Sequence, residues 1–189
     1  MADNTCHFGI NSFFADNGLS DTQSWLYFPA DPAQMVAIVK RVFFEKGVRF
    51  VFSTRSKVPW ILNADGSRFF GDSYEFVPGK DETIVEGDAG YVVAYGDMLY
   101  RAWDAVLRCR EQGLDVGLIN KPTLNVVDEQ TIRKIGATKF VLVAESLNQK
   151  TGVSLVGMCY DVIGDVSARA CILRGTGTRA GVLERWTVD

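Results

Sequence analysis

The fold of this chain is decided by residues 89–145, where three apolar runs alternate with helical patterns. The first run is Tyr91-Val92-Val93-Ala94, which leads into the turn Tyr95-Gly96-Asp97. The second is Leu114-Asp115-Val116-Gly117-Leu118-Ile119-Asn120, and the third is Phe140-Val141-Leu142-Val143-Ala144-Glu145. Short runs rich in Val, Ile and Leu, separated by helices, are typical of a parallel sheet that is covered on both faces. The order predicts a doubly wound, Rossmann-like, mostly parallel α/β fold with a crevice at the C-terminal ends of its strands.

Helical patterns separate these runs. Between the first two runs, apolar side chains recur at the spacing of one helix face and predict a stripe that faces the core. This stripe consists of Leu99, Ala102, Val106 and Cys109. A shorter helix is expected around Asp128-Glu129-Gln130-Thr131-Ile132. Further along the chain, residues 153–158 suggest another helix, and Ala170-Cys171-Ile172-Leu173 suggests a further strand.

A helix flanked by two strands precedes this region. Trp25-Leu26-Tyr27-Phe28 predicts a short buried strand, and Arg49-Phe50-Val51-Phe52-Ser53 predicts the next one. Between them, Asp31 suits a helix N-cap, and Pro32 suits the first helical position, where its missing N–H costs nothing. Gly47 is expected to end the helix. The apolar face expected for this helix consists of Met35, Ile38, Val39 and Val42.

The segment from residue 57 to residue 86 loses both periodicities. Its turn-forming residues include Pro59, Gly66, Gly71, Pro78 and Gly79. The segment is longer than an ordinary loop within a domain, so we interpret it as a connector that contains one or two short strands. The sequence therefore predicts two parts, residues 1–60 and residues 88–189, joined by a connector over residues 61–87.

Composition and charge exclude several classes of protein. The chain has 189 residues, of which 47% are hydrophobic and 23% charged, as is typical of a globular protein. A formal net charge of −3 and scattered Lys and Arg argue against a nucleic-acid-binding protein. No apolar run approaches the roughly 18–20 residues needed to cross a bilayer, so no membrane partner is expected. The beginning, Met1-Ala2-Asp3-Asn4, lacks the features of a signal peptide, so we expect a cytoplasmic protein.

Cysteine and histidine usage narrows the chemistry further. The cysteines are far apart in the sequence and form no CxxC pair, which favours reduced thiols over disulfides. They are Cys6, Cys109, Cys159 and Cys171. His7 is the only histidine, which argues against metal sites built from histidine. Any nucleophile that histidine activates would have to use this one ring.

Three residues are candidate contacts for a ligand. Arg55 follows a predicted strand, where a cation would face the crevice of the sheet and could bind an anion. A solvated surface position explains Arg55 equally well. His7 and Asp16 could form an acid–base or hydrogen-bonding pair, since a carboxylate fixes the tautomer of an imidazole and raises its pKa. A structural role is the alternative for His7.

Two turns and one carboxylate each have two possible roles. Tyr95-Gly96-Asp97 lies between a strand and a helix, where backbone N–H groups could hold an anion, but a tight turn is the favoured explanation. Gly175-Thr176-Gly177-Thr178-Arg179 could bind a phosphate or form a terminal loop, and the loop is favoured. Glu145, at the end of a strand, is either a loop cap or a catalytic group.

The order of these pieces resembles the C-terminal part of a transketolase, from the thiamine-diphosphate-dependent ketol transferase family. Residues 90–152 resemble that family's C-terminal domain through Val93-Ala94-Tyr95-Gly96-Asp97, Gly113-Leu114-Asp115-Val116 and Val143-Ala144-Glu145. Upstream motifs resemble the last third of its pyrimidine-binding domain. These motifs are His7-Phe8-Gly9, Phe14-Ala15-Asp16-Asn17-Gly18, Phe28-Pro29-Ala30-Asp31, and Ser53-Thr54-Arg55-Ser56 with Pro59.

The resemblance implies a transketolase C-terminal domain over residues 88–189, preceded by the end of a thiamine-diphosphate-binding pyrimidine domain over residues 1–60. It also implies thiamine diphosphate and Mg²⁺ as cofactors of the complete enzyme. The family's Gly-Asp-Gly…Asn motif for these cofactors, and the glutamate that activates the aminopyrimidine, are missing from the sequence. We therefore expect no cofactor on this chain alone. Its expected partner is the remaining transketolase-like domains or another subunit, in an enzyme that is a homodimer when complete.

Carried over by position, His7, Asp16 and Arg55 match family residues that contact substrate at the mouth of the cofactor site. Where the family has a histidine for the substrate phosphate, this chain reads Leu19-Ser20-Asp21-Thr22-Gln23, and the Asp21 carboxylate would repel a phosphate. The resemblance implies ketol transfer between sugars by the complete enzyme, with this chain inactive alone. One alternative is a non-catalytic module for dimerisation or regulation. The other is part of a related thiamine enzyme, such as a deoxyxylulose-phosphate synthase, a phosphoketolase or a 2-oxoacid dehydrogenase.

Overall fold

Six strands form the larger of two sheets in the computed structural model, which describes residues 24–53, 57–145, 169–174 and 183–184. The helix expected at residues 153–158 lies outside the described residues. The elements are β1 (Ser24–Tyr27), α2 (Pro32–Val42), β2 (Val48–Val51), β3 (Glu82–Val85), β4 (Gly90–Ala94), η2 (Gly96–Met98), α3 (Leu99–Glu111), β5 (Val116–Asn120), α4 (Glu129–Gly136), β6 (Phe140–Glu145), β7 (Arg169–Arg174) and β8 (Leu183–Glu184).

The larger sheet is mostly parallel. Its strand order is β3-β5-β4-β6-β7-β8, in which β4, β5, β6 and β7 run parallel and both edge strands run antiparallel. The chain passes from β4 to β5 on one side and then crosses to β6 on the other side of β4. The doubly wound, mostly parallel α/β arrangement predicted from the sequence is confirmed. The strand predicted near residues 170–173 is confirmed as β7.

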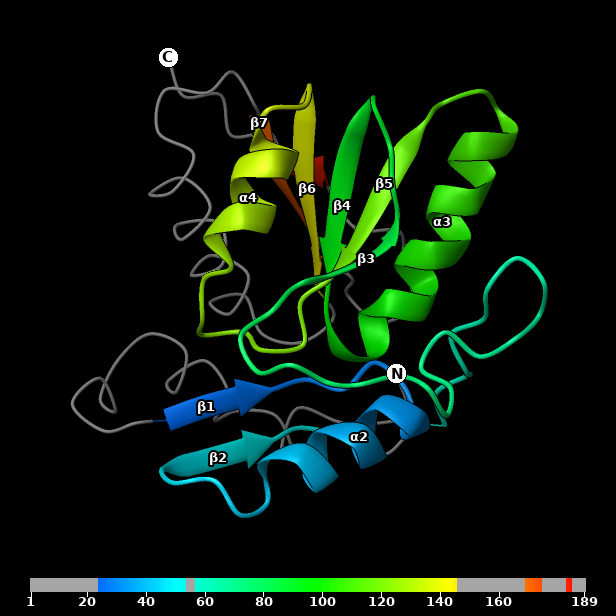
Figure 1. Cartoon of the computed structure of the whole chain (residues 1–189). Coiled ribbons are helices and arrows are strands. Elements are labelled where there is room, and N and C mark those ends of the chain that lie inside the picture. Colours follow the sequence, from blue (N-terminus) through cyan, green and yellow to red (C-terminus); the bar gives the residue numbers. More distant parts are fainter. Residues whose placement is uncertain (1–23, 54–56, 146–168, 175–182, 185–189) are drawn as a thin grey trace.

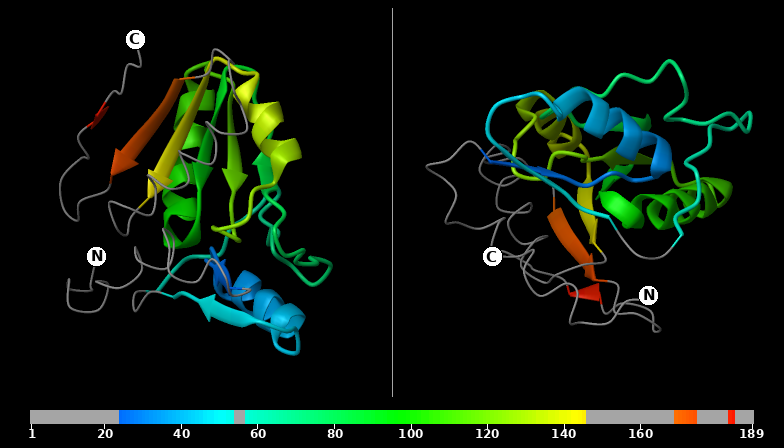
Figure 2. Two further views of the ribbon diagram at one scale, coloured as in Figure 1. Left: turned by 90° about the vertical axis from the view of Figure 1, so that its left-hand side faces the viewer. Right: turned by 90° about the horizontal axis from the view of Figure 1, so that it is seen from below.

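The helices α3 and α4 cover opposite faces of this sheet (Figures 1 and 2). Successive side chains of a strand point to opposite faces, so two hydrophobic clusters result. On the α4 face, the buried helix and strand residues are Tyr91, Val93, Ile119, Ile132, Ile135, Val141 and Val143. On the α3 face, they are Ala94, Leu99, Ala102, Val106, Val116, Leu118 and Ala144. The predicted stripe on α3 therefore faces the core, with Cys109 at its partly buried end.

A smaller unit, β1-α2-β2, lies at the C-terminal ends of the parallel strands, as the arrowheads in Figure 2 show. Main-chain hydrogen bonds join it to the segment that follows β5: Phe28 N–H donates to Pro122 O at 2.8 Å, and Leu124 N–H donates to Leu26 O at 2.9 Å. Leu26 and Phe28 also belong to the hydrophobic cluster on the α4 face. The two sheets therefore share one hydrophobic core. The strands predicted on either side of this helix are confirmed as β1 and β2.

The helix α2 begins as predicted but ends earlier. Asp31 Oδ1 accepts a hydrogen bond from Gln34 N–H at 2.9 Å, and Pro32 occupies the first helical position. The helix ends at Val42. Gly47, with φ +97°, instead completes the turn that leads into β2, so the expectation that Gly47 ends the helix is wrong.

The buried face of α2 differs from the predicted one. Gln34, Ile38 and Val42 are its buried residues. Val39 is 39% exposed, so its predicted place in the core is wrong. Because each residue turns the helix by about 100°, the position after Ile38 is carried toward the outside. Met35 is only half-buried.

The segment between β2 and β3 packs against both units. Ile61 and Phe70 are buried in the cluster on the α3 face. Phe76 packs edge-on against Tyr27, with ring centroids 5.6 Å apart. At its end the segment forms β3, one of the short strands expected there, which pairs antiparallel with β5.

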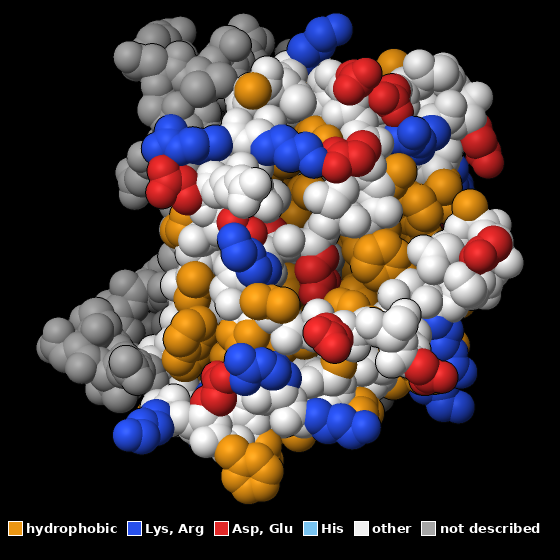
Figure 3. Space-filling model, in the orientation of Figure 1, with side chains coloured by type: hydrophobic (Ala, Val, Ile, Leu, Met, Phe, Trp, Pro, Cys, Tyr) orange, Lys and Arg blue, Asp and Glu red, His pale blue; other side chains and the backbone are white. Residues whose placement is uncertain are grey.

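The outer surface of the β1-α2-β2 unit exposes large hydrophobic side chains. Val36, Phe43 and Phe44 on or after α2 are 52%, 65% and 92% exposed. At the lower end of the molecule, where this unit lies, Figure 3 shows hydrophobic side chains between Lys and Arg side chains. Within the described residues, no strand pairs with the outer edge of β2.

Candidate functional site

Buried polar side chains gather at the C-terminal end of β5, between the larger sheet and α2. Asn120 ends this apolar strand and Lys121 follows it, and both are 0% exposed. The helix α2 contributes Gln34, and the start of β3 contributes Glu82. The polar cluster, as we call it, consists of Gln34, Tyr74, Asp81, Glu82, Asn120 and Lys121.

Lys121 and Asp81 form a buried ion pair at one side of the polar cluster. The ammonium Nζ lies 3.0 Å from Oδ1 of Asp81 and donates to the backbone oxygen of Val126 at 2.7 Å. The two side chains are 0% and 2% exposed. Removal of either partner would leave a buried group without its counterpart, which typically costs about 3–5 kcal/mol.

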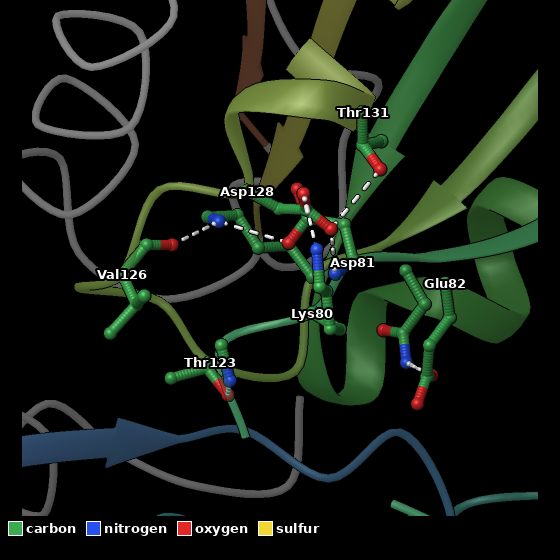
Figure 4. A network of polar contacts seen from close by, with 10 residues as sticks. Lys80, Asp81, Glu82, Thr123, Val126, Asp128 and Thr131 are labelled. Atoms are coloured by element: carbon green, nitrogen blue, oxygen red, sulfur yellow. Dashed lines mark hydrogen bonds and ion pairs between the residues drawn. The ribbon is translucent and has the colours of Figure 1, made fainter. Parts of the chain in front are cut away.

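Asp128, immediately before α4, ties this ion pair to the start of that helix. Its carboxylate accepts hydrogen bonds from Asp81 N–H at 3.1 Å, from the Lys80 ammonium at 3.2 Å and from the Thr131 hydroxyl at 3.2 Å. Figure 4 shows Asp128 among these partners. Burial acts to raise the pKa of Asp128, but the hydrogen bonds and the Lys80 charge outweigh it and hold the pKa below its usual value. Asp128 is therefore an ionised anchor at neutral pH.

Glu82 accepts the hydrogen bonds of the other half of the polar cluster. Its Oε2 accepts from Asn120 Nδ2 and from Gln34 Nε2, each at 2.8 Å, and its Oε1 accepts from the Tyr74 hydroxyl. All three donors are neutral groups. Burial raises the pKa of Glu82 to about 7, although the hydrogen bonds act in the opposite direction. This carboxyl group therefore exchanges a proton near neutral pH.

Gln34 is held in one orientation. Its Oε1 accepts from the backbone N–H of Ala30 at 2.8 Å and from Asn120 Nδ2 at 3.3 Å. Since both contacts need an acceptor, the amide nitrogen must point toward Glu82. Gln34 thereby connects the start of α2 to β3 and β5.

The chemistry of the polar cluster fits a positioning role. Burial raises the pKa of Asp81 to about 6, against the attraction of Lys121. Carboxyl groups with raised pKa occur at functional sites and also in structural networks. Here Gln34, Asn120 and Lys121 have no exposed surface, so a substrate has no access to them. The arrangement can fix α2 against the larger sheet.

The substrate contacts expected from the sequence, His7, Asp16 and Arg55, lie outside the described residues and stay predictions. The candidate phosphate loop at residues 175–179 also lies outside them. β6 ends at Glu145, whose side chain is not among the described ones.

The turn Tyr95-Gly96-Asp97 lies at the C-terminal end of β4. Gly96 has φ +57°, and a Cβ placed on it would lie 3.7 Å from the Phe28 side chain. Phe28 therefore packs directly over this glycine, and a buried, left-handed glycine agrees with the tight turn rather than with an open anion site.

No local pattern in the sequence predicts the polar cluster, because its members come from separate segments. Gln34 and Asn120 are 86 positions apart. The one local signal is Asn120-Lys121-Pro122 at the end of an apolar strand, since a lysine placed there must find a buried acceptor.

Two features of the described residues bear on the kind of site. Within residues 24–53, 57–145, 169–174 and 183–184, no three His, Cys, Asp or Glu residues gather as they would around a metal ion. None of the helices in those ranges is both long and apolar enough to span a bilayer.

Comparison with known proteins identifies relatives of this chain. Residues 79–157 match the family model of the transketolase C-terminal domain. The chain is 26% identical over 169 residues to a subunit of apulose-4-phosphate transketolase from Actinobacillus succinogenes, with 89% of this chain and 50% of the relative covered. It is 28% identical over 109 residues to a protein of the same description from Phocaeicola vulgatus, with 58% and 33% covered. The chain thus spans about half, or less, of the length of these curated relatives.

Solved structures show the same fold. A structure described as a split gene transketolase, inactive beta4 tetramer, superposes with a TM-score of 0.66 at 22% identity, over 80% of this chain and 49% of the other. A transketolase variant from Pichia stipitis superposes with a TM-score of 0.55 at 19% identity, over 75% of this chain and 20% of the other. The predicted fold class, that of the transketolase C-terminal domain, is confirmed, and the chain is homologous to transketolase-family proteins.

Proposed function

We propose that this chain is the C-terminal portion of a transketolase-like enzyme that uses thiamine diphosphate to transfer a ketol unit, such as glycolaldehyde, between sugars. The observation that carries the proposal is the match to one subunit of each of two apulose-4-phosphate transketolases, of which the chain spans about half or less. We therefore assign the activity to an assembly of this chain with the remaining transketolase-like domains. The chain alone is expected to be inactive.

The β1-α2-β2 unit supports the assignment of residues 1–60 to the end of a pyrimidine-binding domain. A two-stranded sheet is at best marginally stable by itself, and parallel sheets are normally covered on both faces. Here the two strands pair in parallel, and β2 is an edge strand within the described residues. The unit thus has the character of one end of a larger parallel sheet. This supports the division into residues 1–60, a connector over residues 61–87 and a C-terminal domain over residues 88–189.

The cofactors are assigned to the complementing part of the enzyme. The sequence lacks the Gly-Asp-Gly…Asn motif with which the family holds thiamine diphosphate and Mg²⁺. Among the described residues, no group of carboxylates is arranged to hold a metal ion. These residues do not fit the cofactor, and none of them is assigned a part in its chemistry.

His7, Asp16 and Arg55 are the substrate contacts proposed for this chain. The Arg55 guanidinium would neutralise an anionic group of the substrate. His7 and Asp16 would hydrogen-bond substrate hydroxyl groups or relay a proton. The polar cluster contributes by holding α2, which connects β1 to the strand that leads to Arg55. We further propose a cytoplasmic enzyme that is a homodimer when complete.

Complementation tests the proposed function. The chain is mixed with a larger transketolase-like polypeptide that carries the cofactor motif, thiamine diphosphate and Mg²⁺. Ketol transfer is then measured with phosphorylated and unphosphorylated ketoses. Transfer that neither polypeptide shows alone is the expected result. It should fall by about 10- to 100-fold in Arg55→Ala, because a hydrogen bond to a charged group is lost. Arg108→Ala, at an exposed arginine on α3, is the matched control and should leave transfer unchanged. Pairing without transfer would contradict the proposal.

A non-catalytic module for dimerisation or regulation is the second candidate. It is supported by the solved split gene transketolase whose description is an inactive beta4 tetramer. This candidate predicts pairing or self-association without transfer in the complementation experiment. Part of a related thiamine-diphosphate enzyme is a further alternative, and transfer with other ketol donors would identify it.

A further inference from the structure

The helix α2 is apolar on two faces, of which only one is packed. Its inner face belongs to the buried cluster around Tyr27. Helical spacing places Val36, Val39 and Phe43 together on the outer face, and they are 52%, 39% and 65% exposed. A helix that is hydrophobic all round is typically a buried helix. The outer face of α2 therefore has the composition of a covered surface.

The turn after α2 extends this outer face. Phe44 is 92% exposed, and its ring packs edge-on against Phe43 with centroids 4.9 Å apart. The α2 patch, as we call it, consists of Val36, Val39, Phe43 and Phe44. Exposed aromatic side chains that adjoin aliphatic ones are typical of interaction sites, whereas scattered single hydrophobic residues are not.

Cations surround the α2 patch. Lys40 lies on the same helix face, between Val36 and Phe43. The β1-α2-β2 unit carries the cations Lys40, Arg41, Lys46 and Arg49 and the carboxylates Asp31 and Glu45.

The two carboxylates offset only part of this positive charge, and Lys40, Lys46 and Arg49 stay unmatched by a carboxylate on the surface of this unit. Asp31 is buried and caps the helix, and Glu45 pairs with Arg41. The whole chain nevertheless has a formal net charge of −3. The α2 patch is therefore an apolar, positive region on an acidic protein, in agreement with the lower end of Figure 3.

We propose that the α2 patch docks the complementing polypeptide of the enzyme, through a surface with apolar side chains at its centre and carboxylates around them. The identity of this partner rests on the proposed function. Its chemistry rests on the patch, since complementary charge steers association and a central aromatic group supplies much of the binding energy.

A second copy of this chain is a poorer occupant for the patch. In a two-fold pair of α2 helices, the axis would pass near Val39 and Lys40, at the middle of the outer face. The two Lys40 ammonium groups would then approach each other, and like charges across an interface oppose association. An acidic partner removes this repulsion.

Matched lysine substitutions test the docking surface. Val39→Lys is compared with Leu107→Lys on α3, because the two aliphatic side chains are 39% and 42% exposed and both lie within helices. Binding of the full chain to the larger transketolase polypeptide is measured by calorimetry. Val39→Lys should weaken binding by about 30-fold, as at a central interface position, and Leu107→Lys should have little effect. Circular dichroism and thermal melting check that both variants stay folded.

Two further variants test the aromatic and electrostatic parts separately. Phe43→Ala removes the aromatic ring without adding charge and should also weaken binding. Lys40→Glu should weaken binding at low salt, and this effect should shrink as salt rises, since exposed charges are screened.

The outcomes separate this inference from the proposed function. Equal affinities of Val39→Lys and Leu107→Lys, or no binding by the unmodified chain, would overturn the docking surface. Ketol transfer restored by the same mixture would still support the proposed function. Patch-dependent binding without transfer would support the docking surface and count against the function.

Two measurements on the chain alone test whether a second copy or a membrane, rather than the complementing polypeptide, binds the α2 patch. Sedimentation is compared between the unmodified chain and Val39→Lys, and self-association lost in the variant would assign the patch to a second copy. Binding to vesicles of phosphatidylcholine and phosphatidylserine that Val39→Lys abolishes would assign it to a membrane. Either result would overturn the proposed partner.

Discussion

Glu82 is a carboxyl group whose hydrogen-bond donors, Tyr74, Gln34 and Asn120, are all neutral. Burial places its pKa at about 7 in the folded chain, above the reference value of 4.5. Folding therefore takes up a proton between these two pH values. The stabilising contribution of Glu82 is therefore fully present below pH 4.5 and is lost as the pH rises through the folded pKa of about 7.

Glu82→Gln tests this titration. The variant keeps the shape of the side chain but cannot ionise, so the unmodified chain should lose stability relative to it between about pH 5 and pH 7, and the difference should level off at higher pH. The relative loss should be at most about 1.4 kcal/mol per pH unit below the folded pKa. Denaturant unfolding at several pH values measures it, with Glu111→Gln at an exposed position of α3 as the control. Parallel pH profiles of the unmodified chain and Glu82→Gln would contradict the assignment.

Lys121→Met tests the buried ion pair. The substitution leaves the Asp81 carboxylate buried without its cation, so the free energy of unfolding should fall by about 3–5 kcal/mol at pH 8. The loss should be smaller at pH 5, because Asp81, with its pKa of about 6, is then mostly protonated. The double variant with Lys121→Met and Asp81→Leu should lose less free energy of unfolding than the sum of the losses in the two single variants, because it leaves no uncompensated charge. Additive losses would show that the two groups act independently.

At the level of elements, Asp31 holds the start of α2 to the segment that follows β2. Its Oδ1 accepts from Gln34 N–H, and its Oδ2 accepts from Ile61 N–H at 3.0 Å. Asp31→Ala should therefore cost about 0.5–2 kcal/mol for the helix cap and about 1–3 kcal/mol for the unpaired Ile61 N–H. Asp31→Asn keeps one acceptor and should cost less. Denaturant unfolding measures both, and Asp104→Ala on the exposed side of α3 should stay within about 0.5 kcal/mol.

The sequence predicts α3 more accurately than α2 for a physical reason. In α3 the outer side carries a single large aliphatic residue, Leu107, and the stripe of Leu99, Ala102 and Val106 is the one face that can turn toward the sheet. In α2, Val36 and Val39 mark an outer apolar face beside the inner one of Ile38 and Val42. Periodicity cannot choose between two apolar faces, and only the contacts with Tyr27 and Phe76 decide which is buried.

The polar cluster could not be predicted for a different reason. Its hydrogen bonds join positions that are 48 and 86 apart, as in Gln34–Glu82 and Gln34–Asn120. Sequence patterns report local periodicity, whereas these contacts depend on which strand becomes the neighbour of β5. β3 pairs antiparallel with β5 and thereby brings Glu82 into the polar cluster. No local sequence pattern predicts that β5 is the strand with which β3 pairs.

At the level of the whole molecule, the two sheets should unfold together because they share a core. Phe28 of the smaller unit is 2% exposed, and its ring lies 5.2 Å from that of Tyr95 beyond β4. In single-tryptophan variants, fluorescence from Trp25 in β1 and Trp103 in α3 should report coincident transitions. Phe28→Ala should shift both by about 3–5 kcal/mol. A shift confined to the Trp25 signal would show that the units unfold separately.

The outer edge of β2 has a consequence for how the cell supplies this chain. Within the described residues, that edge presents backbone N–H and C=O groups without a neighbouring strand. Such an edge can template pairing with other extended peptides, including other copies of itself, and growth of this kind produces aggregates. Surplus chain should therefore precipitate, and synthesis in strict stoichiometry with its complement would protect solubility.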